Sequence, residues 1–230
     1  MYLPVKRSGS QELLTVNASA PHQLHHDPFG HTVLELTIEE LFPYGQKIVS
    51  LSVDVALRSV ALQEPVGNDW RRAERYIEAS SPEVMALAAS LRRPAPQETA
   101  KAIYEWVAGN IAYAGYRPED YGAKHVLKTR RGDCTEYAYL VTALARALDI
   151  PARMVGGYVT DRDRLPTPED YHNWAELYFD GRWQLVDAQK QFWLTPLEHY
   201  IAFRYFREEA HPLLHHAHRF RVEGTIKAGV

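Results

Sequence analysis

The 230-residue sequence predicts an α+β fold in which a helix packs on an antiparallel sheet, preceded by a short N-terminal β extension. Three observations lead to this fold class. Residues 32–62 alternate apolar and polar side chains, as half-buried strands do. Several stretches between residues 69 and 148 place apolar side chains at helical spacing, and residues 171–189 contain two strand patterns joined by Asp180-Gly181.

The β extension comes first along the chain. The stretches 31–40 and 47–60 are rich in Val, Leu and Ile, and the Pro-Tyr-Gly sequence at 43–45 is typical of a turn between them. We therefore assign residues 1–65 to an N-terminal β region and residues 66–200 to a core domain. Residues 201–230 are left as a C-terminal extension of unknown role.

The pattern then changes to a helical period. Residues 69–79 are predicted to form a first helix. Ser81 followed by Pro82 supplies the N-cap and first position of a second helix, which ends near Arg93. A third helix is expected from Pro96, with one apolar stripe whose simplest role is core packing.

The stretch 131–148 is the most informative helix. Gly132 permits a turn, Asp133 can cap the helix, and Glu136 follows three positions later, so the two acidic residues form an acidic version of the capping box. Cys134 is thereby placed at the first helical position. The apolar face of this helix contains Tyr137, Leu140, Val141, Leu144 and Leu148.

Strand patterns follow this helix. Residues 152–160 are predicted to form one strand, residues 162–170 a loop, and residues 171–179 and 182–189 a hairpin. Asp-Gly is a strong signal for a two-residue type I′ turn. The helix is therefore expected to pack on an antiparallel sheet.

Composition restricts the possible partners. With 26 basic and 29 acidic residues the formal net charge is -3, so no overall field would attract nucleic acid or an anionic membrane. The first 17 residues lack the apolar run of a signal peptide, and no stretch reaches transmembrane length. We therefore expect a soluble cytoplasmic protein with no nucleic-acid or membrane partner.

The single cysteine excludes an internal disulfide and a cysteine-rich zinc site, so Cys134 is either a small buried hydrophobe or a reactive thiol. A thiol attacks as the thiolate, and a helix N-terminus or a nearby imidazolium lowers its pKa from about 8.5. The free N–H groups of the first turn also provide donors for an oxyanion. Asp133 and Glu136 would raise the pKa of the thiol unless capping occupies their carboxylates, and a cationic histidine partner would then be needed.

The hairpin predicts which side chains meet. If Asp180-Gly181 is a two-residue loop, Phe179 faces Arg182 and the residues on either side pair outward from there. Trp174 then lies opposite Asp187, and His172 lies opposite Gln189. These four side chains share one face of the sheet. His172 and Asp187 are diagonal neighbours that a hydrogen bond can join, and such a pair would leave the other imidazole nitrogen free to take a thiol proton.

These segments resemble the transglutaminase-like superfamily, which shares the papain-type order of cysteine, histidine and a third polar residue. The matching segments are R-G-D-C-T-E-Y-A at 131–138, L-D-I-P-A-R at 148–153, H-N-W-A-E-L-Y at 172–178 and G-R-W-Q-L-V-D-A-Q at 181–189. The resemblance extends from about residue 69 to residue 189, although the usual D-P-T after the last strand is D-A-Q here. It implies a papain-like core with Cys134 as nucleophile, His172 as general base and acid, and Asp187 as third member.

Three further residues are candidates on the oxyanion or substrate side. The segment W-V-A-G-N-I-A-Y at 106–113 resembles the helix that precedes the catalytic cysteine in this family, which implies a substrate or oxyanion contact for Tyr113. Trp174 is either a packing residue or a shield against water, and Gln189 shares its face.

No metal ion and no cofactor are predicted. Imidazole is a common metal ligand, but the histidines lack a convincing helical pair with an acidic partner, so a solvated surface or tail is the better interpretation. The two histidine groups are at 22, 25, 26 and 31 and at 211, 215, 216 and 218.

The resemblance implies an enzyme that forms an acyl-enzyme thioester at Cys134 from an amide or peptide bond. If water resolves the thioester, the enzyme is a cysteine protease or amidase, which we favour for an intracellular bacterial member by family analogy. An amine acceptor would make it a transglutaminase or amide synthase. The partner is then a peptide or protein, or a small amide or amine. A catalytically silent peptide- or protein-binding module is the third possibility.

Overall fold

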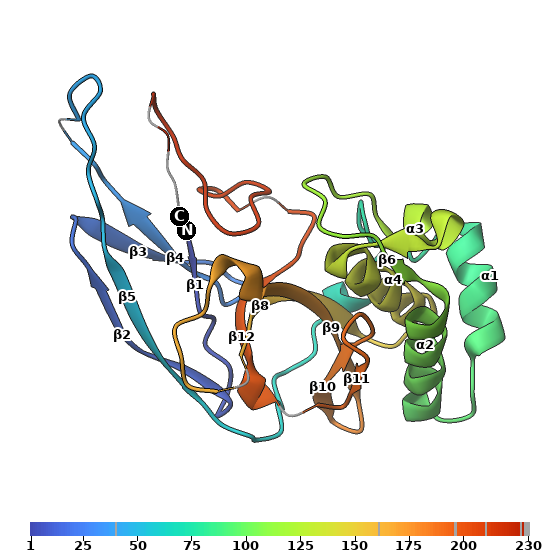
Figure 1. Cartoon of the computed structure of the whole chain (residues 1–230). Coiled ribbons are helices and arrows are strands. Elements are labelled where there is room, and N and C mark those ends of the chain that lie inside the picture. Colours follow the sequence, from blue (N-terminus) through green and yellow to red (C-terminus); the bar gives the residue numbers. More distant parts are fainter. Residues whose placement is uncertain (40, 161, 196, 210, 226, 228–230) are drawn as a thin grey trace.

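A computed structural model describes residues 1–39, 41–160, 162–195, 197–209, 211–225 and 227. The helices are α1 (Pro82–Leu91), α2 (Pro96–Asn110), α3 (Ala123–Thr129) and α4 (Cys134–Ala147). The strands are β1 (Tyr2–Leu3), β2 (Gln11–Ala18), β3 (His22–His26), β4 (Thr32–Leu36), β5 (Leu51–Leu57), β6 (Ala112–Tyr113), β7 (Arg131–Gly132), β8 (Ala152–Val159), β9 (Tyr171–Phe179), β10 (Arg182–Asp187), β11 (Phe192–Trp193) and β12 (Tyr200–Tyr205). Figure 1 shows the helices gathered on one side of a curved sheet, with β1 to β5 on the other side. The α+β fold class is confirmed.

The central sheet has the strand order β11-β10-β9-β8-β12, and every neighbouring pair is antiparallel. The β9–β10 hairpin has the predicted register, from Phe179 opposite Arg182 to Ala175 opposite Val186. Its turn residues have φ of 53° at Asp180 and 74° at Gly181, the left-handed conformation that a type I′ turn requires. The hairpin prediction is therefore confirmed in both turn and register.

The two faces of this sheet cover different cores, because side chains alternate along each strand. We call the side that packs against the helices the helix face. It contains Met154, Ala175, Leu177, Phe179 and Val186. We call the opposite side the inner face. It contains Val155, Trp174, Trp183, Leu185, Tyr200, Ala202 and Tyr205, which pack with Val5, Leu62 and Trp70.

The N-terminal region borders both edges of this sheet. On one edge the backbone N–H of Val5 donates to the carbonyl oxygen of Ala202 at 2.9 Å, and the side chain of Gln11 bonds both the N–H and the C=O of Ala202. Near the other edge, beyond the residues of β10 that pair with β11, the N–H of Trp183 donates to the carbonyl oxygen of Leu62 at 2.8 Å. Parts of residues 1–65 are therefore built into the core domain.

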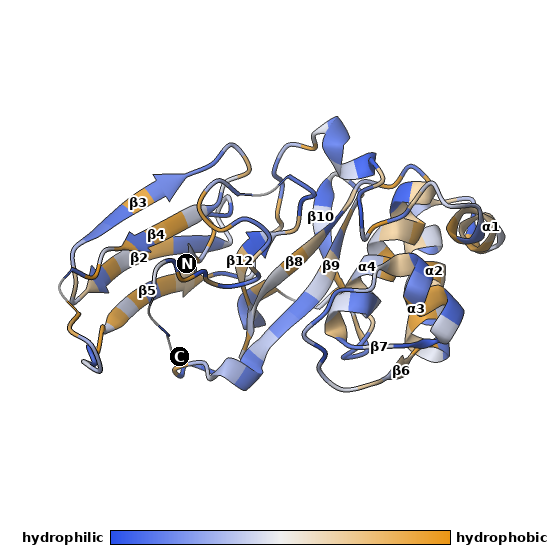
Figure 2. Cartoon of the chain, turned by 90° about the horizontal axis from the view of Figure 1, so that it is seen from above, coloured by the Kyte–Doolittle hydropathy of each residue, from blue (hydrophilic) through white to orange (hydrophobic). Residues whose placement is uncertain are grey.

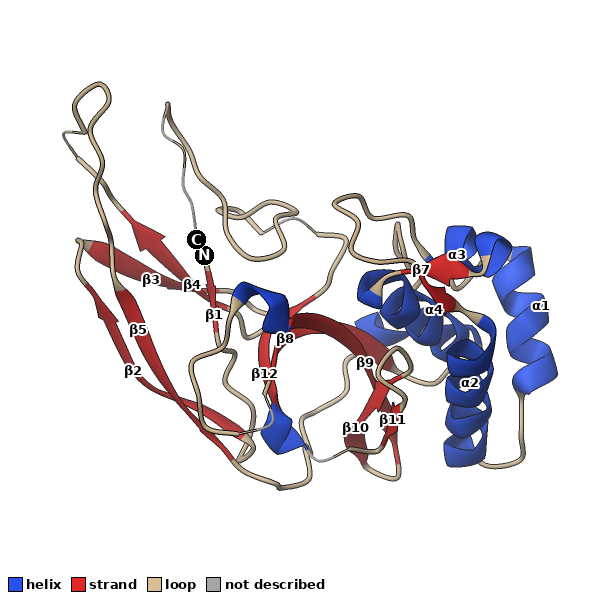
Figure 3. Ribbon diagram, viewed as in Figure 1, coloured by secondary structure: helices blue, strands red, loops and turns tan. Residues whose placement is uncertain are grey.

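The rest of the N-terminal region forms a β1-β4-β3 sheet and a β2-β5 ribbon. The strands predicted within residues 32–62 are present as β4 and β5. The sequence did not indicate β2 and β3, because β3 has the sequence HQLHH and β2 is mostly exposed, so neither has a clear apolar alternation. Figure 3 shows how these strands extend away from the helices.

The helices α1, α2 and α4 were predicted, and Ser81 caps α1 by accepting from the N–H of Val84 at 3.4 Å. The helix predicted at 69–79 is wrong. Only the short 3-10 turn Asn68–Arg71 forms there. The side chain of Trp70 is buried in the inner core, and Glu74 forms an ion pair with Arg146 at 3.3 Å, so tertiary contacts outweigh a weak local helix preference.

The C-terminal stretch also contributes to the core domain. β12 pairs with β8 at the edge of the central sheet, and the boundary we placed at residue 200 falls at its first residue. Among the described residues, none of the helices has the length and apolar character needed to cross a membrane.

Candidate active site

The start of α4 is fixed by the predicted capping box. The carboxylate of Asp133 accepts from the N–H of Thr135 at 2.8 Å, and the carboxylate of Glu136 accepts from the N–H of Asp133 at 3.1 Å. A side chain at Gly132 could not fit, since its Cβ would lie 2.5 Å from the Cβ of Glu136. Cys134 is the first residue of the helix, as its sequence context predicted.

Both acidic groups also hold the loop that precedes α3. The carboxylate of Asp133 accepts from the N–H of Arg117 at 3.0 Å, and that of Glu136 accepts from the N–H of Tyr121 at 3.2 Å. Burial raises the pKa of Glu136 to about 7. The cap therefore connects the helix start to the neighbouring loop.

Cys134 is a half-buried thiol with a raised pKa. Burial is the largest cause, the charge of Asp133 adds to it, and the pKa reaches about 12. The N–H of Asn173 donates to the sulfur and opposes these effects only in part. Burial and the charge of Asp133 therefore outweigh any lowering by the helix N-terminus, and the thiol needs a base to remove its proton.

His172 and Asp187 form the hydrogen bond that the hairpin register predicted. The Nε2 atom of His172 lies 2.7 Å from Oδ2 of Asp187, and both side chains are buried. Asp187 also accepts from the N–H of Lys190 at 3.0 Å and from the hydroxyl of Tyr200 at 2.9 Å. A carboxylate with these donors accepts rather than donates, so the proton sits on Nε2 and Nδ1 remains an acceptor.

No pattern in the sequence indicated Tyr200. It lies on β12, which is separated from β10 by two intervening strands in the sheet order. Its hydroxyl reaches Asp187 only because the sheet curves strongly, as Figure 1 shows. The burial of Tyr200 and the negative charge of Asp187 raise the pKa of Tyr200, so its hydroxyl keeps its proton and remains a donor.

Helix α4 meets β9 at Asn173, the neighbour of His172. The side chain of Asn173 donates to the hydroxyl of Thr135 at 2.9 Å, and its backbone N–H contacts the sulfur of Cys134. From the sequence, the approach of Cys134 to the hairpin rested on resemblance alone; here it has direct contacts. α4 packs on the helix face, whereas His172 alternates with Asn173 and points to the inner face, so the thiol meets the hairpin near the first residues of β9.

Much of β9 is hydrophilic although it is buried, as its colour in Figure 2 shows. Buried polar groups cost free energy unless they are paired, and those of β9 pair with α4, β8, β10 and the N-terminal region, apart from Oδ1 of Asn173. The polar stretch of β9 therefore belongs to a site rather than to a simple core strand.

Comparison with known proteins agrees with this geometry. Residues 85–188 match the family model of the transglutaminase-like superfamily. The chain carries a transglutaminase-like domain. The match includes α4, β9 and β10, the elements that contribute Cys134, His172 and Asp187.

Solved structures share the fold of this chain. A candidate cysteine protease from Cytophaga hutchinsonii is 21% identical with a TM-score of 0.64, covering 89% of this chain and 74% of that one. The periplasmic domain of TgpA from Pseudomonas aeruginosa is 21% identical with a TM-score of 0.52, covering 79% and 66% of the two chains. At these identities the likeness shows the fold alone.

A curated relative is similar over a shorter stretch. The human kyphoscoliosis peptidase is 28% identical over 105 residues, which cover 40% of this chain. The chain matches only 15% of the length of that protein. The similarity therefore concerns one domain of a longer relative.

The three remaining candidates lie in different environments. Tyr113 pairs with Gly132 across the parallel β6–β7 bridge and is 57% exposed, and burial and the nearby Cys134 raise its pKa. Trp174 is 1% exposed within the inner core, so it is a packing residue at the least. Gln189 is half-buried in the turn after β10. Of the three candidates, Tyr113 is therefore the most exposed, and it lies near the thiol.

Within the described residues no group of three or more His, Cys, Asp or Glu side chains is placed to hold a metal ion. The histidines have other contacts instead. His31 pairs with Asp27 at 2.6 Å and accepts from the N–H of Tyr205, while the backbones of His211 and His215 form a bridge.

Proposed function

We propose that this transglutaminase-like domain is a thiol enzyme that attacks an amide or peptide carbonyl with Cys134, uses His172 as base and acid, and orients His172 with Asp187. The observation that carries this proposal is the 2.7 Å bond between Nε2 of His172 and Asp187, one residue away from the backbone N–H that contacts the Cys134 sulfur. A peptide or protein is the proposed substrate.

The first half of the reaction uses the proton that the buried thiol retains. Nδ1 of His172 takes the proton from the sulfur of Cys134 as the sulfur attacks the carbonyl carbon, and Asp187 stabilises the resulting imidazolium. The N–H groups at the start of α4 are donors for the oxyanion. His172 then gives its proton to the departing amine, which leaves a thioester on Cys134.

The second half decides the class of enzyme. When His172 removes a proton from water, the thioester is hydrolysed and the thiol is regenerated; when it removes a proton from an amine, a new amide forms. We favour hydrolysis, since one structural neighbour is described as a candidate cysteine protease and the curated relative is named a peptidase. Transfer to an amine is the alternative.

Alkylation by iodoacetamide tests the base. Cys134 is the only cysteine in the chain, so every alkylation event reports this thiol. We expect His172→Ala to slow alkylation at neutral pH at least about tenfold, because a general base commonly contributes a hundredfold or more. The matched control is His25→Ala, which removes a half-buried histidine paired with Glu35 at 2.8 Å. An unchanged rate in His172→Ala would refute the proposed activation.

A substrate assay separates the outcomes of the second half. A peptide library that includes glutamine is incubated with and without a primary amine, and the products are weighed by mass spectrometry. Cleaved or deamidated peptide identifies a hydrolase, and an amine adduct identifies a transferase. Binding of a peptide with neither product, and with no thioester on Cys134, would identify a silent module and contradict the proposal.

A further inference from the structure

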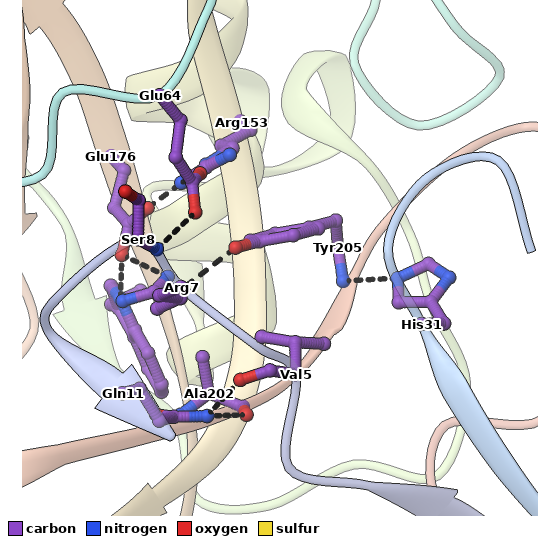
Figure 4. Close-up of polar contacts among 11 residues, drawn as sticks. Val5, Arg7, Ser8, Gln11, His31, Glu64, Arg153, Glu176, Ala202 and Tyr205 are labelled. Carbon is purple, nitrogen blue, oxygen red and sulfur yellow. Dashed lines mark hydrogen bonds and ion pairs between the residues drawn. The ribbon is translucent and has the colours of Figure 1, made fainter. Parts of the chain in front are cut away.

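A group of buried charges lies behind the proposed active site, on the inner face of the sheet (Figure 4). Glu176 on β9 accepts from Arg7 at 2.5 Å and from Arg153 on β8 at 2.9 Å. Arg153 also pairs with Glu64 at 3.0 Å. The two arginines and the two glutamates balance in charge, which makes their burial tolerable.

Two members of this group come from the N-terminal region. Arg7 follows Val5, which is bonded to β12, and Glu64 follows Leu62, which is bonded to β10. Figure 4 shows Arg7 extending toward Glu176, with Tyr205 beside it. The hydroxyl of Tyr205 accepts from Nε of Arg7 at 3.2 Å. The N-terminal region thus places a cation inside the core domain.

The side chain of Trp174 connects these charged residues to His172. The Nε1–H of Trp174 donates to Glu176 at 3.2 Å, on the same oxygen that accepts from Arg7. The ring of Trp174 stacks on that of His172, with centroids 6.5 Å apart and an angle of 22° between the planes. The carboxylate therefore sets the rotation of the indole, and the indole faces the imidazole.

Trp174 also contacts a residue that holds Asp187, the hydrogen-bond partner of His172. Its ring meets that of Tyr200 edge-on, with centroids 4.9 Å apart. The hydroxyl of Tyr200 donates to Asp187, which in turn holds His172. A rotation of Trp174 would therefore disturb both His172 and the group that orients it.

Electrostatics keep Glu176 in its charged form. Burial raises the pKa of Glu176, but the neighbouring Arg7 and Arg153 outweigh this effect and hold the pKa below its usual value. A charged carboxylate is a stronger acceptor for the indole N–H than a neutral acid. Without Arg7, one of the two cations that keep Glu176 charged would be lost.

We propose that Glu176 and Trp174 are positioning residues for His172, and that Arg7 makes the N-terminal region part of this positioning. The chain of contacts runs from Arg7 to Glu176, then to Trp174 and to His172. This inference rests on the proposed role of His172 as the base. It assigns to residues 1–65 a part in catalysis, beyond their part in the fold.

The decisive variant is Trp174→Phe, which keeps an aromatic ring in the core and removes the N–H that Glu176 accepts. We expect alkylation of Cys134 at neutral pH to slow about threefold to tenfold, the range that corresponds to one net hydrogen bond. The slowing should be largest at neutral pH and should disappear as the pH rises toward the pKa of the thiol, where Cys134 loses its proton without the base. Rates are compared only after circular dichroism shows a folded protein.

Arg7→Lys tests the N-terminal end of the chain of contacts. Lysine keeps the charge but lacks the planar guanidinium group, so we expect alkylation of Cys134 to slow less than in Trp174→Phe. The double variant with Trp174→Phe should lose no more than the larger single loss, since both changes interrupt one chain. Fully additive losses, or a wild-type pH profile in the folded single variants, would overturn the inference.

Arg146→Met is the matched control. Arg146 is also a buried arginine in an ion pair, with Glu74 at 3.3 Å, but it lies at the opposite end of α4 from Cys134. It should lower the melting temperature and leave the pH profile of alkylation unchanged. If His172→Ala also leaves the profile unchanged, the proposed function and this inference both fail. If His172→Ala changes the profile but Trp174→Phe and Arg7→Lys leave it unchanged, the inference alone fails.

Discussion

The two faces of the central sheet are equally buried but are built from different chemistry. The helix face is apolar, with residues such as Leu177 and Val186 packed against α4. The inner face combines aromatic rings with buried charges, among them Arg7, Arg153 and Glu176. Apolar contacts are non-directional, whereas hydrogen bonds and ion pairs fix orientation. The helix face therefore contributes stability through apolar burial, whereas the inner face also fixes the geometry of His172 and Asp187.

The start of β9 is where the two kinds of surface meet. Asn173 contacts α4 through Thr135, and its neighbour His172 bonds Asp187 on the other side of the sheet. The proposed nucleophile on the helix and the proposed base on the sheet can approach each other at this junction. Changes on either face should therefore have separable effects on stability and on thiol reactivity.

The largest expected effect comes from the inner face. Glu176→Ala leaves Arg7 and Arg153 buried without their shared partner, which should lower the free energy of unfolding by about 3–5 kcal/mol. Urea denaturation at neutral pH measures it. A loss below about 1 kcal/mol would mean that the two arginines find other partners.

The pH dependence of this loss sharpens the comparison. The folded pKa of Glu176 lies below its unfolded value, so its contribution is complete above the unfolded pKa and declines as the pH falls through the folded one. The difference between wild type and Glu176→Ala should therefore shrink in acid. An equal difference at neutral and acidic pH would contradict the charged state that the two arginines impose.

A large-to-small change on the helix face should behave differently. Leu140→Ala removes a fully buried side chain from α4 and should cost roughly 2–5 kcal/mol, through lost burial and a residual cavity. Its cost should be nearly the same at neutral and acidic pH, and the folded variant should keep the wild-type pH profile of Cys134 alkylation. A shifted profile would show that the helix face also sets the geometry of the site.

The smallest effect is expected at the junction itself. Asp133→Asn keeps a good N-cap but removes the second-largest cause of the raised pKa of Cys134, after burial. The pKa of the thiol should fall, and alkylation at a fixed pH should become severalfold faster. The N–H of Arg117 loses its acceptor, which should cost about 1–3 kcal/mol of stability. Alkylation that is slower or unchanged in the folded variant would show that the Asp133 charge does not control the thiol.

Local sequence signals were sufficient for much of the site. The capping box placed Cys134 at the first residue of α4, because caps depend on residues within one turn. The Asp180-Gly181 turn fixed the register that joins His172 to Asp187, because a two-residue loop leaves one alignment of the strands. Both predictions concern residues that are close in sequence or related by a tight turn.

The tertiary structure alone decided which distant residues complete the site. Tyr200 reaches Asp187, Asn173 reaches α4, and Arg7 reaches Glu176 across 169 positions of the chain. It also decided the pKa of Cys134, since burial outweighs the helix N-terminus. The curvature of the sheet and the exclusion of water from Cys134 depend on how the whole chain packs. A local pattern of residues carries no information about either.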